Sequence, residues 1–172
     1  MGIDISTTLS NNWLGGALFG FLSSIFLVRH VFSQPATRQH TGISLAFDIG
    51  WTGLIYGLMD ALLLNVMPVL AIQAVFAGTS WANTLLGKIG LGVLAMLGSL
   101  LITLTYHLGY PEFRNKKIVK VLVGNSIMTL AVLLSGNPLG ALISHPVMHI
   151  AAVLRGPETT IQLPPHYYSH SN

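Results

Sequence analysis

The chain of 172 residues contains no cysteine and few charged side chains. Without cysteine it can form neither a disulfide nor a thiolate metal site nor an iron–sulfur cluster. Charged residues make up 8% of the sequence, whereas a typical soluble domain has about 25%. The net charge of +3 is too small and too scattered for a nucleic-acid-binding surface. These shortages exclude an ordinary water-soluble globule, a disordered chain and a nucleic-acid partner.

Long apolar runs fill most of the sequence instead. Hydrophobic residues make up 52% of the chain, and the mean hydropathy is +0.67. Several runs approach the roughly 20 apolar residues that cross a bilayer as a helix, and they lack the alternation of a membrane strand. We predict an all-α membrane bundle of five transmembrane helices in one domain, residues 1–155, embedded in the lipid bilayer. The predicted spans are residues 13–32, 43–66, 85–107, 118–135 and 139–154.

Prolines and glycines mark the ends of these runs. Met67-Pro68 is predicted to end the second span, so the apolar residues 68–76 become a short interfacial helix. A tight turn over residues 135–138 predicts that the last two spans form a hairpin. The fifth run is the shortest and contains a proline, so a re-entrant segment over 139–154 is the alternative. Residues 156–172 form a polar tail.

The basic residues predict the orientation in the membrane. If all five runs span, Lys88 is alone on one side, and the other seven lysines and arginines lie on the opposite side. Because basic loops stay on the cytoplasmic side, we expect the N-terminus outside and the C-terminus with its tail inside. Residues 1–12 contain Asp4 and no basic residue, unlike a cleavable signal peptide, so the first span is expected to remain as an anchor.

A few ionisable residues lie inside the predicted spans, where they are costly unless paired. Asp60 lies seven residues before Met67, which places it about 10 Å below the outer edge, and His145 lies at a similar depth. His149 follows His145 by one helical turn, a spacing at which two imidazoles can bind one metal. Asp60, His145 and His149 are therefore a predicted metal or proton site, with purely structural hydrogen bonds as the alternative. His145, His149 and His107 are candidate ligands of a haem or pigment.

Two further polar groups are predicted within the bundle. Asp48, His30 and His107 lie near the inner interface and are expected to form a second, shallower cluster, unless they simply reach water. Asn125 and Thr129, four residues apart, are expected to hold helices together by hydrogen bonds, with the fifth span as their partner.

The small size, the odd number of predicted spans and the lack of a complete catalytic set favour an accessory or structural subunit of a larger membrane complex. Its buried Asp/His interior would hold a haem, a pigment or a divalent metal, and its partners would be other membrane subunits or further copies of the chain. A proton- or metal-coupled transporter or channel, working as an oligomer, is the alternative. An intramembrane metalloenzyme ranks third, because no general base is evident beyond the ligands themselves; the sequence leaves enzymatic activity undecided and leans against it.

Overall fold

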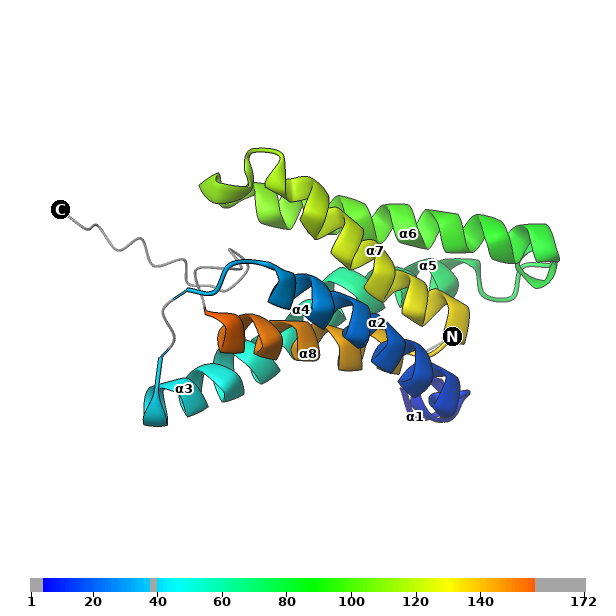
Figure 1. Cartoon of the computed structure of the whole chain (residues 1–172). Helices are drawn as coiled ribbons and strands as arrows, with labels where there is room; N and C mark the ends of the chain where they lie inside the picture. The colour runs from blue at the N-terminus through cyan, green and yellow to red at the C-terminus, as the bar shows by residue number, and fades with distance from the viewer. Residues whose placement is uncertain (1–4, 38–39, 157–172) are drawn as a thin grey trace.

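The computed structural model describes residues 5–37 and 40–156, and every regular element in that part of the chain is a helix (Figure 1). The all-α prediction is confirmed. The elements are α1 (Ile5–Ser10), α2 (Trp13–Ser33), α3 (Gly42–Asp48), η1 (Ile49–Ile55), α4 (Tyr56–Asp60), η2 (Ala61–Val66), α5 (Met67–Phe76), η3 (Trp81–Asn83), α6 (Leu85–Leu108), η4 (Pro111–Phe113), α7 (Lys117–Ser135) and α8 (Leu139–Arg155). Both η1 and η2 are π-helical, whereas η3 and η4 are short 3-10 turns.

Four helices are long and apolar enough to cross a membrane, judged by length and composition. They are α2, α6, α7 and the continuous helix Gly42–Phe76, called the long helix below. The fifth predicted span, α8, has 17 residues and a length of about 25 Å. It falls short of the roughly 30 Å of bilayer hydrocarbon. The fifth span therefore stays a prediction, as does its re-entrant alternative.

The helix break predicted at Met67-Pro68 is absent, whereas the interfacial location of residues 68–76 stays a prediction. The long helix runs without a break through Pro68 and has 35 residues in all. Its last turns, α5, pack against α6 instead of forming a separate helix. Proline has no N–H to give to the carbonyl four residues earlier, which here belongs to Leu64. That carbonyl accepts the hydroxyl of Ser99 at 2.6 Å, so the loss is compensated from a neighbouring helix.

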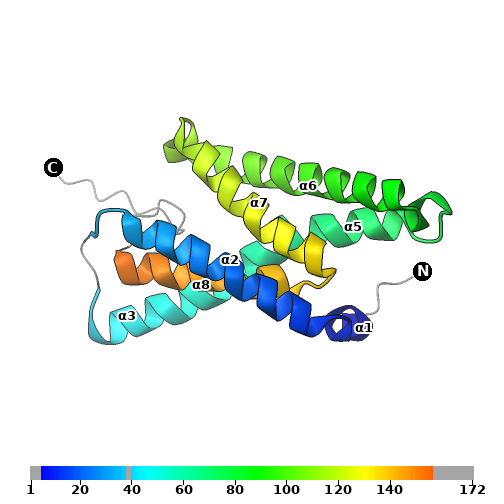
Figure 2. The same cartoon turned by 45° about the vertical axis from the view of Figure 1, so that its right-hand side comes forward.

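The helix α8 forms the centre of the bundle and contacts α2, α7 and the long helix (Figure 2). Glycines let these helices approach closely. A Cβ on Gly140 would lie 2.7 Å from the carbonyl carbon of Ala131 in α7, and one on Gly57 would lie 2.6 Å from the Cα of Pro146. The predicted hairpin of α7 and α8 is present. Because it is surrounded, α8 buries both of its histidines.

One end of the bundle gathers basic residues. Arg155 closes α8 and donates from Nε and Nη2 to the carbonyl of Gln34, at 2.9 and 2.7 Å, so the C-terminal ends of α2 and α8 lie together. The first turn of α7, with Lys117 and Lys120, lies at the same end, and Lys88 lies at the opposite end of α6 (Figure 1). We call it the basic end. The membrane side that it faces stays a prediction, and the tail from residue 157 lies outside the described residues.

Two glycines of the long helix provide a matched test of this packing. We expect Gly57→Ala to lower the free energy of unfolding by about 1–3 kcal/mol, because the added methyl group would clash with the backbone of Pro146. Gly50→Ala meets nothing within 4 Å, so the better helix propensity of alanine should leave stability unchanged or raise it by up to about 1 kcal/mol. Thermal or denaturant unfolding in detergent measures both. Equal effects at the two positions would contradict the close approach of α8.

Candidate functional site

Asp60 lies in the middle of the long helix. It is the last residue of α4, with η1 before it and η2 after it, and its side chain is buried. The helix does not end near Met67 but continues to Phe76, about 24 Å beyond Asp60, and the depth of Asp60 below the outer membrane edge stays a prediction. Single π turns inside α-helices often occur at functional sites. Here two of them flank the one carboxylate that the described residues place deep in the bundle.

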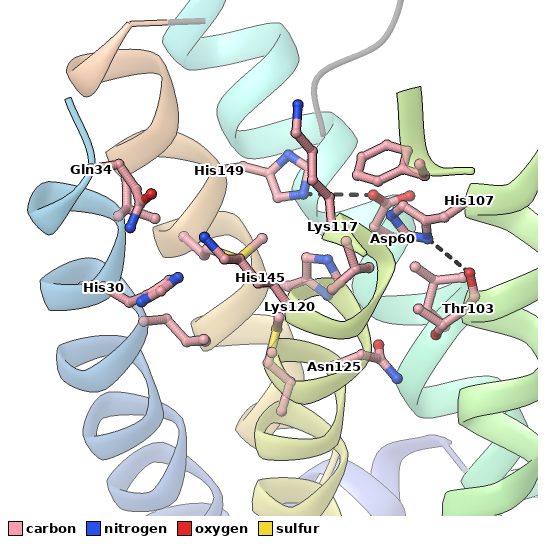
Figure 3. A pocket seen from close by; sticks show the side chains of 18 residues that line it. His30, Gln34, Asp60, Thr103, His107, Lys117, Lys120, Asn125, His145 and His149 are labelled. Carbon is pink, nitrogen blue, oxygen red and sulfur yellow. Dashed lines mark hydrogen bonds and ion pairs between the residues drawn. The ribbon is translucent and has the colours of Figure 1, made fainter. Parts of the chain in front are cut away.

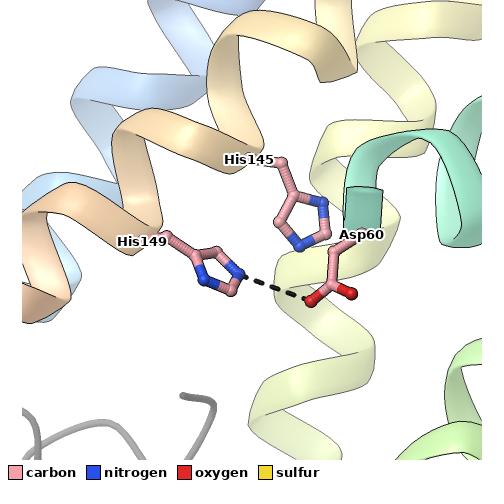
Figure 4. Close-up of side chains that lie close together, drawn as sticks. All are labelled: Asp60, His145 and His149. Carbon is pink, nitrogen blue, oxygen red and sulfur yellow. Dashed lines mark ion pairs between the residues drawn. The ribbon is translucent and has the colours of Figure 1, made fainter. Parts of the chain in front are cut away.

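His145 and His149 lie one turn apart on the buried side of α8. Their rings are 5.2 Å apart between centroids, and the side chains are 4% and 1% exposed. Both imidazoles turn toward the carboxylate of Asp60 on the facing helix (Figure 4). One ligand atom from each of the three residues lies within 4.8 Å of the others. The structure thus brings together the predicted metal site, which we call the triad.

The spacing within the triad is wider than a direct contact. Nε2 of His149 and Oδ2 of Asp60 are 3.5 Å apart, whereas a charge-assisted N–H···O bond is typically about 2.7–2.9 Å long. Two ligands bound tetrahedrally to one Zn²⁺ at about 2.1 Å are about 3.4 Å apart. The pair is therefore spaced as two ligands of a single ion would be.

The other ring nitrogen of His149 is also buried. Among the described residues, no group makes a hydrogen bond of normal geometry with its Nδ1, although the backbone of Thr52 lies nearby. Histidines that bind a metal usually donate the second ring N–H to a carbonyl or carboxylate. The Thr52 backbone is placed to take that role if the ring settles onto an ion.

A chain of hydrogen bonds fixes the direction of the amide groups behind the triad. It begins at the carbonyl of Leu64, which accepts the Ser99 hydroxyl. Because a carbonyl oxygen can only accept, the Ser99 proton is used there, and the Ser99 oxygen accepts from its other two neighbours. These are Nδ2 of Asn125 and the hydroxyl of Thr129, each at 2.8 Å. The Asn125 amide is thereby oriented, with its oxygen turned away from Ser99.

Asn65 passes this orientation on to His145. Its Nδ2 donates to Oδ1 of Asn125 and to the hydroxyl of Thr129, both at 2.8 Å. Its Oδ1 then faces Nδ1 of His145 at 2.9 Å. Since an amide oxygen can only accept, Nδ1 of His145 carries a hydrogen. A neutral His145 therefore has its lone pair on Nε2, the ring nitrogen that points toward Asp60 (Figure 4).

The predicted roles of Asn125 and Thr129 can be compared with these contacts. Both join helices by hydrogen bonds, but their partners are Asn65 and Ser99 on the long helix and α6, not the fifth span. Asn65 is fully buried and was given no role from the sequence. At 100° per residue, a five-residue step from Asp60 places it about 140° away around an α-helix. The π-helical turn η2 brings both residues to the side that faces α8.

A cavity of about 240 Å³ adjoins the triad (Figure 3). Its deep wall includes the triad and His107, whose Nδ1 donates to the carbonyl of Thr103 at 2.8 Å. The exposed residues His30, Lys117 and Lys120 line its mouth at the basic end. The triad therefore has an open side that is reached from the basic end of the bundle.

The second predicted cluster is only partly assembled. His30 and His107 line the same cavity as the triad. Asp48 does not line it; its carboxylate pairs with the exposed His40 at 2.5 Å, at the beginning of the long helix. The sequence prediction therefore separated His30 and His107 from the triad, although all four histidines line one cavity. It also assigned Asp48 to His30 and His107, although Asp48 lies outside that cavity.

The tautomer of His145 tests the hydrogen-bond chain. We expect ¹⁵N NMR of histidine-labelled protein to show His145 neutral with the hydrogen on Nδ1, its signal being assigned by its loss in His145→Gln. Asn65→Leu removes the acceptor and should move the population toward the Nε2–H form, at a stability loss of about 1–3 kcal/mol for the unpaired buried groups. Asn83→Leu, at an exposed position, should change neither. A hydrogen on Nε2 in the unaltered protein would contradict the assigned direction.

The triad has three possible ligands, a fixed histidine tautomer and an open side, an arrangement that could bind a metal ion. Comparison of the chain with protein-family models, with curated proteins and with solved structures finds no match.

Proposed function

We propose that this chain is an integral membrane protein that binds one divalent transition metal through Asp60, His145 and His149. The observation that carries the proposal is the 3.5 Å gap between Nε2 of His149 and Oδ2 of Asp60, which suits a shared ion better than a direct bond. Two imidazoles and one carboxylate are typical ligands of Zn²⁺, and the same set binds Fe²⁺ in non-haem enzymes.

The open side of the triad favours a site at which a ligand exchanges. Structural zinc sites are closed by four protein ligands, whereas sites that act on a ligand have three protein ligands and an open position. Here the described residues supply three, and the cavity adjoins them. When bound, the ion would polarise a ligand or activate a water there. The hydrogen bond from Nδ1 of His145 to Asn65 keeps the lone pair of His145 on Nε2, where it can bind the ion. Metal-binding histidines are commonly oriented by such a bond from the second ring nitrogen.

A single ion fits this interior better than the haem or pigment that the sequence left open. His145 and His149 lie one turn apart on the same side of one helix, so they cannot bind opposite faces of a flat macrocycle. The cavity of about 240 Å³ is also below the roughly 300–1,000 Å³ typical of small-molecule sites. His107 then serves as a wall of the cavity.

In this proposal the protein works in the bilayer as a component of a larger assembly, with other membrane subunits or further copies as partners. The exposed apolar side chains along α2 and α6 support a lipid-facing exterior. The gathering of Lys117, Lys120 and Arg155 at one end supports the orientation with the C-terminus inside.

Metal binding can be tested with an internal control. We expect the untagged full chain in detergent to bind one Zn²⁺ or Co²⁺, and Asp60→Asn, His145→Gln and His149→Gln each to weaken binding by roughly 100-fold or more, since each removes a ligand. The exposed pair Asp48 and His40 offers matched changes, Asp48→Asn and His40→Gln, that should leave the affinity unchanged. Competition with a chromophoric chelator gives the affinities, and elemental analysis gives the stoichiometry.

Two outcomes would overturn the proposal: stoichiometric binding that persists in all three triad variants, or equal losses in the two control variants. Far-ultraviolet circular dichroism and gel filtration show whether each variant is folded, and unchanged spectra make a loss of affinity attributable to the triad.

A metal- or proton-coupled transporter is the second candidate, favoured by the place of Asp60 between two π-helical turns in a membrane-length helix. We expect this candidate to give ion flux in reconstituted vesicles that Asp60→Asn abolishes and Asp48→Asn preserves. Flux of Zn²⁺ and of protons can be followed with trapped fluorescent indicators. Retained flux in folded Asp60→Asn would remove this candidate and leave the metal site itself untouched.

A further inference from the structure

The charges that line the cavity are unbalanced. Among the described residues, Asp60 is the one acidic side chain in its wall, and Lys117 and Lys120 are basic. These two lysines lie on the first turn of α7, three residues apart and so on one face of the helix. A divalent ion in the triad would add two further positive charges. Lys117 and Lys120 are exposed to water, so the charge left uncompensated next to the apolar walls is the net +1 of the ion and Asp60. Such a charge is costly, so the loaded site favours a monoanion.

One part of the lining is apolar. Leu27 and Val31 of α2, Met128 of α7 and Met148 of α8 line the cavity and belong to one apolar cluster. Methionine side chains adapt to flexible aliphatic groups. A fully hydrated inorganic anion would gain nothing from these walls, whereas a short hydrocarbon chain would bury its surface there at about 0.8 kcal/mol for each CH₂ group.

From the charges and the walls together, we propose that the cavity binds a monocarboxylate with a short aliphatic chain as the exchangeable ligand of the metal. One carboxylate oxygen takes the open position that the triad leaves. The carboxylate then balances the net charge of the ion and Asp60, Lys117 and Lys120 attract the anion from the mouth, and the aliphatic chain lies along Leu27 and Met128. This inference rests on the proposed metal site and names the class of ligand that the site takes.

The test uses the full chain in detergent, loaded with Co²⁺, whose visible absorption reports its ligands. Titration with butyrate is expected to change the Co²⁺ spectrum and to saturate, with acetate binding more weakly because it lacks the buried chain. The double variant Lys117→Gln and Lys120→Gln should bind Co²⁺ normally and butyrate at least tenfold more weakly. The matched double variant Lys88→Gln and Lys116→Gln, at exposed positions outside the cavity, should bind butyrate as the unaltered protein does.

Each other outcome overturns a stated part. Normal Co²⁺ binding with no spectral response to butyrate would overturn this inference and leave the proposed function standing. Absence of Co²⁺ binding would overturn both. Tighter binding of inorganic phosphate than of butyrate would show that the apolar walls do not contribute to ligand binding. An unchanged butyrate affinity in the Lys117 and Lys120 variant would show that the two lysines at the mouth do not contribute either.

Discussion

The hydrogen bond from Ser99 to the carbonyl of Leu64 is the contact on which the order of the interior depends. It exists because Pro68 cannot supply the N–H that this carbonyl would otherwise accept. In an apolar surrounding each buried donor needs its acceptor, so fixing one hydroxyl proton fixes the next amide in turn. The consequence reaches His145 through Asn65, and a residue that the sequence marks as a helix breaker thus sets which imidazole nitrogen of His145 carries the hydrogen.

Much of this molecule follows from its sequence. Apolar runs predict the helices, and the rarity of ionisable residues in them correctly selects Asp60, His145 and His149 as side chains that turn inward. The i, i+4 spacing of the histidines predicts their common face, because α8 stays α-helical there although Pro146 lies between them. These predictions depend on the amino-acid composition and on the 3.6-residue period of the α-helix, and both can be read directly from a sequence.

What the sequence could not show depends on departures from that period and on distant partners. The π turns change which residues of the long helix share a face, so the α-helical period gives Asn65 no role beside Asp60. The continuation through Pro68 depends on Ser99, which is 35 residues from Leu64 in sequence. The pairing of Asp48 with His40 arises in the connection before the long helix. None of these contacts leaves a pattern in a single sequence.

The length of the helix Gly42–Phe76 has a mechanical consequence. Its 35 residues extend about 52 Å, well beyond the roughly 30 Å of bilayer hydrocarbon. In the bilayer location that we propose, a helix of that length would have to tilt steeply or extend at one end into the lipid headgroups, depending on the thickness of the bilayer. Gly57 packs closely against Pro146 of α8, one turn before Asp60. A change in bilayer thickness that tilted the long helix would therefore change the crossing of these two helices, and with it the distance between the Asp60 carboxylate and His149.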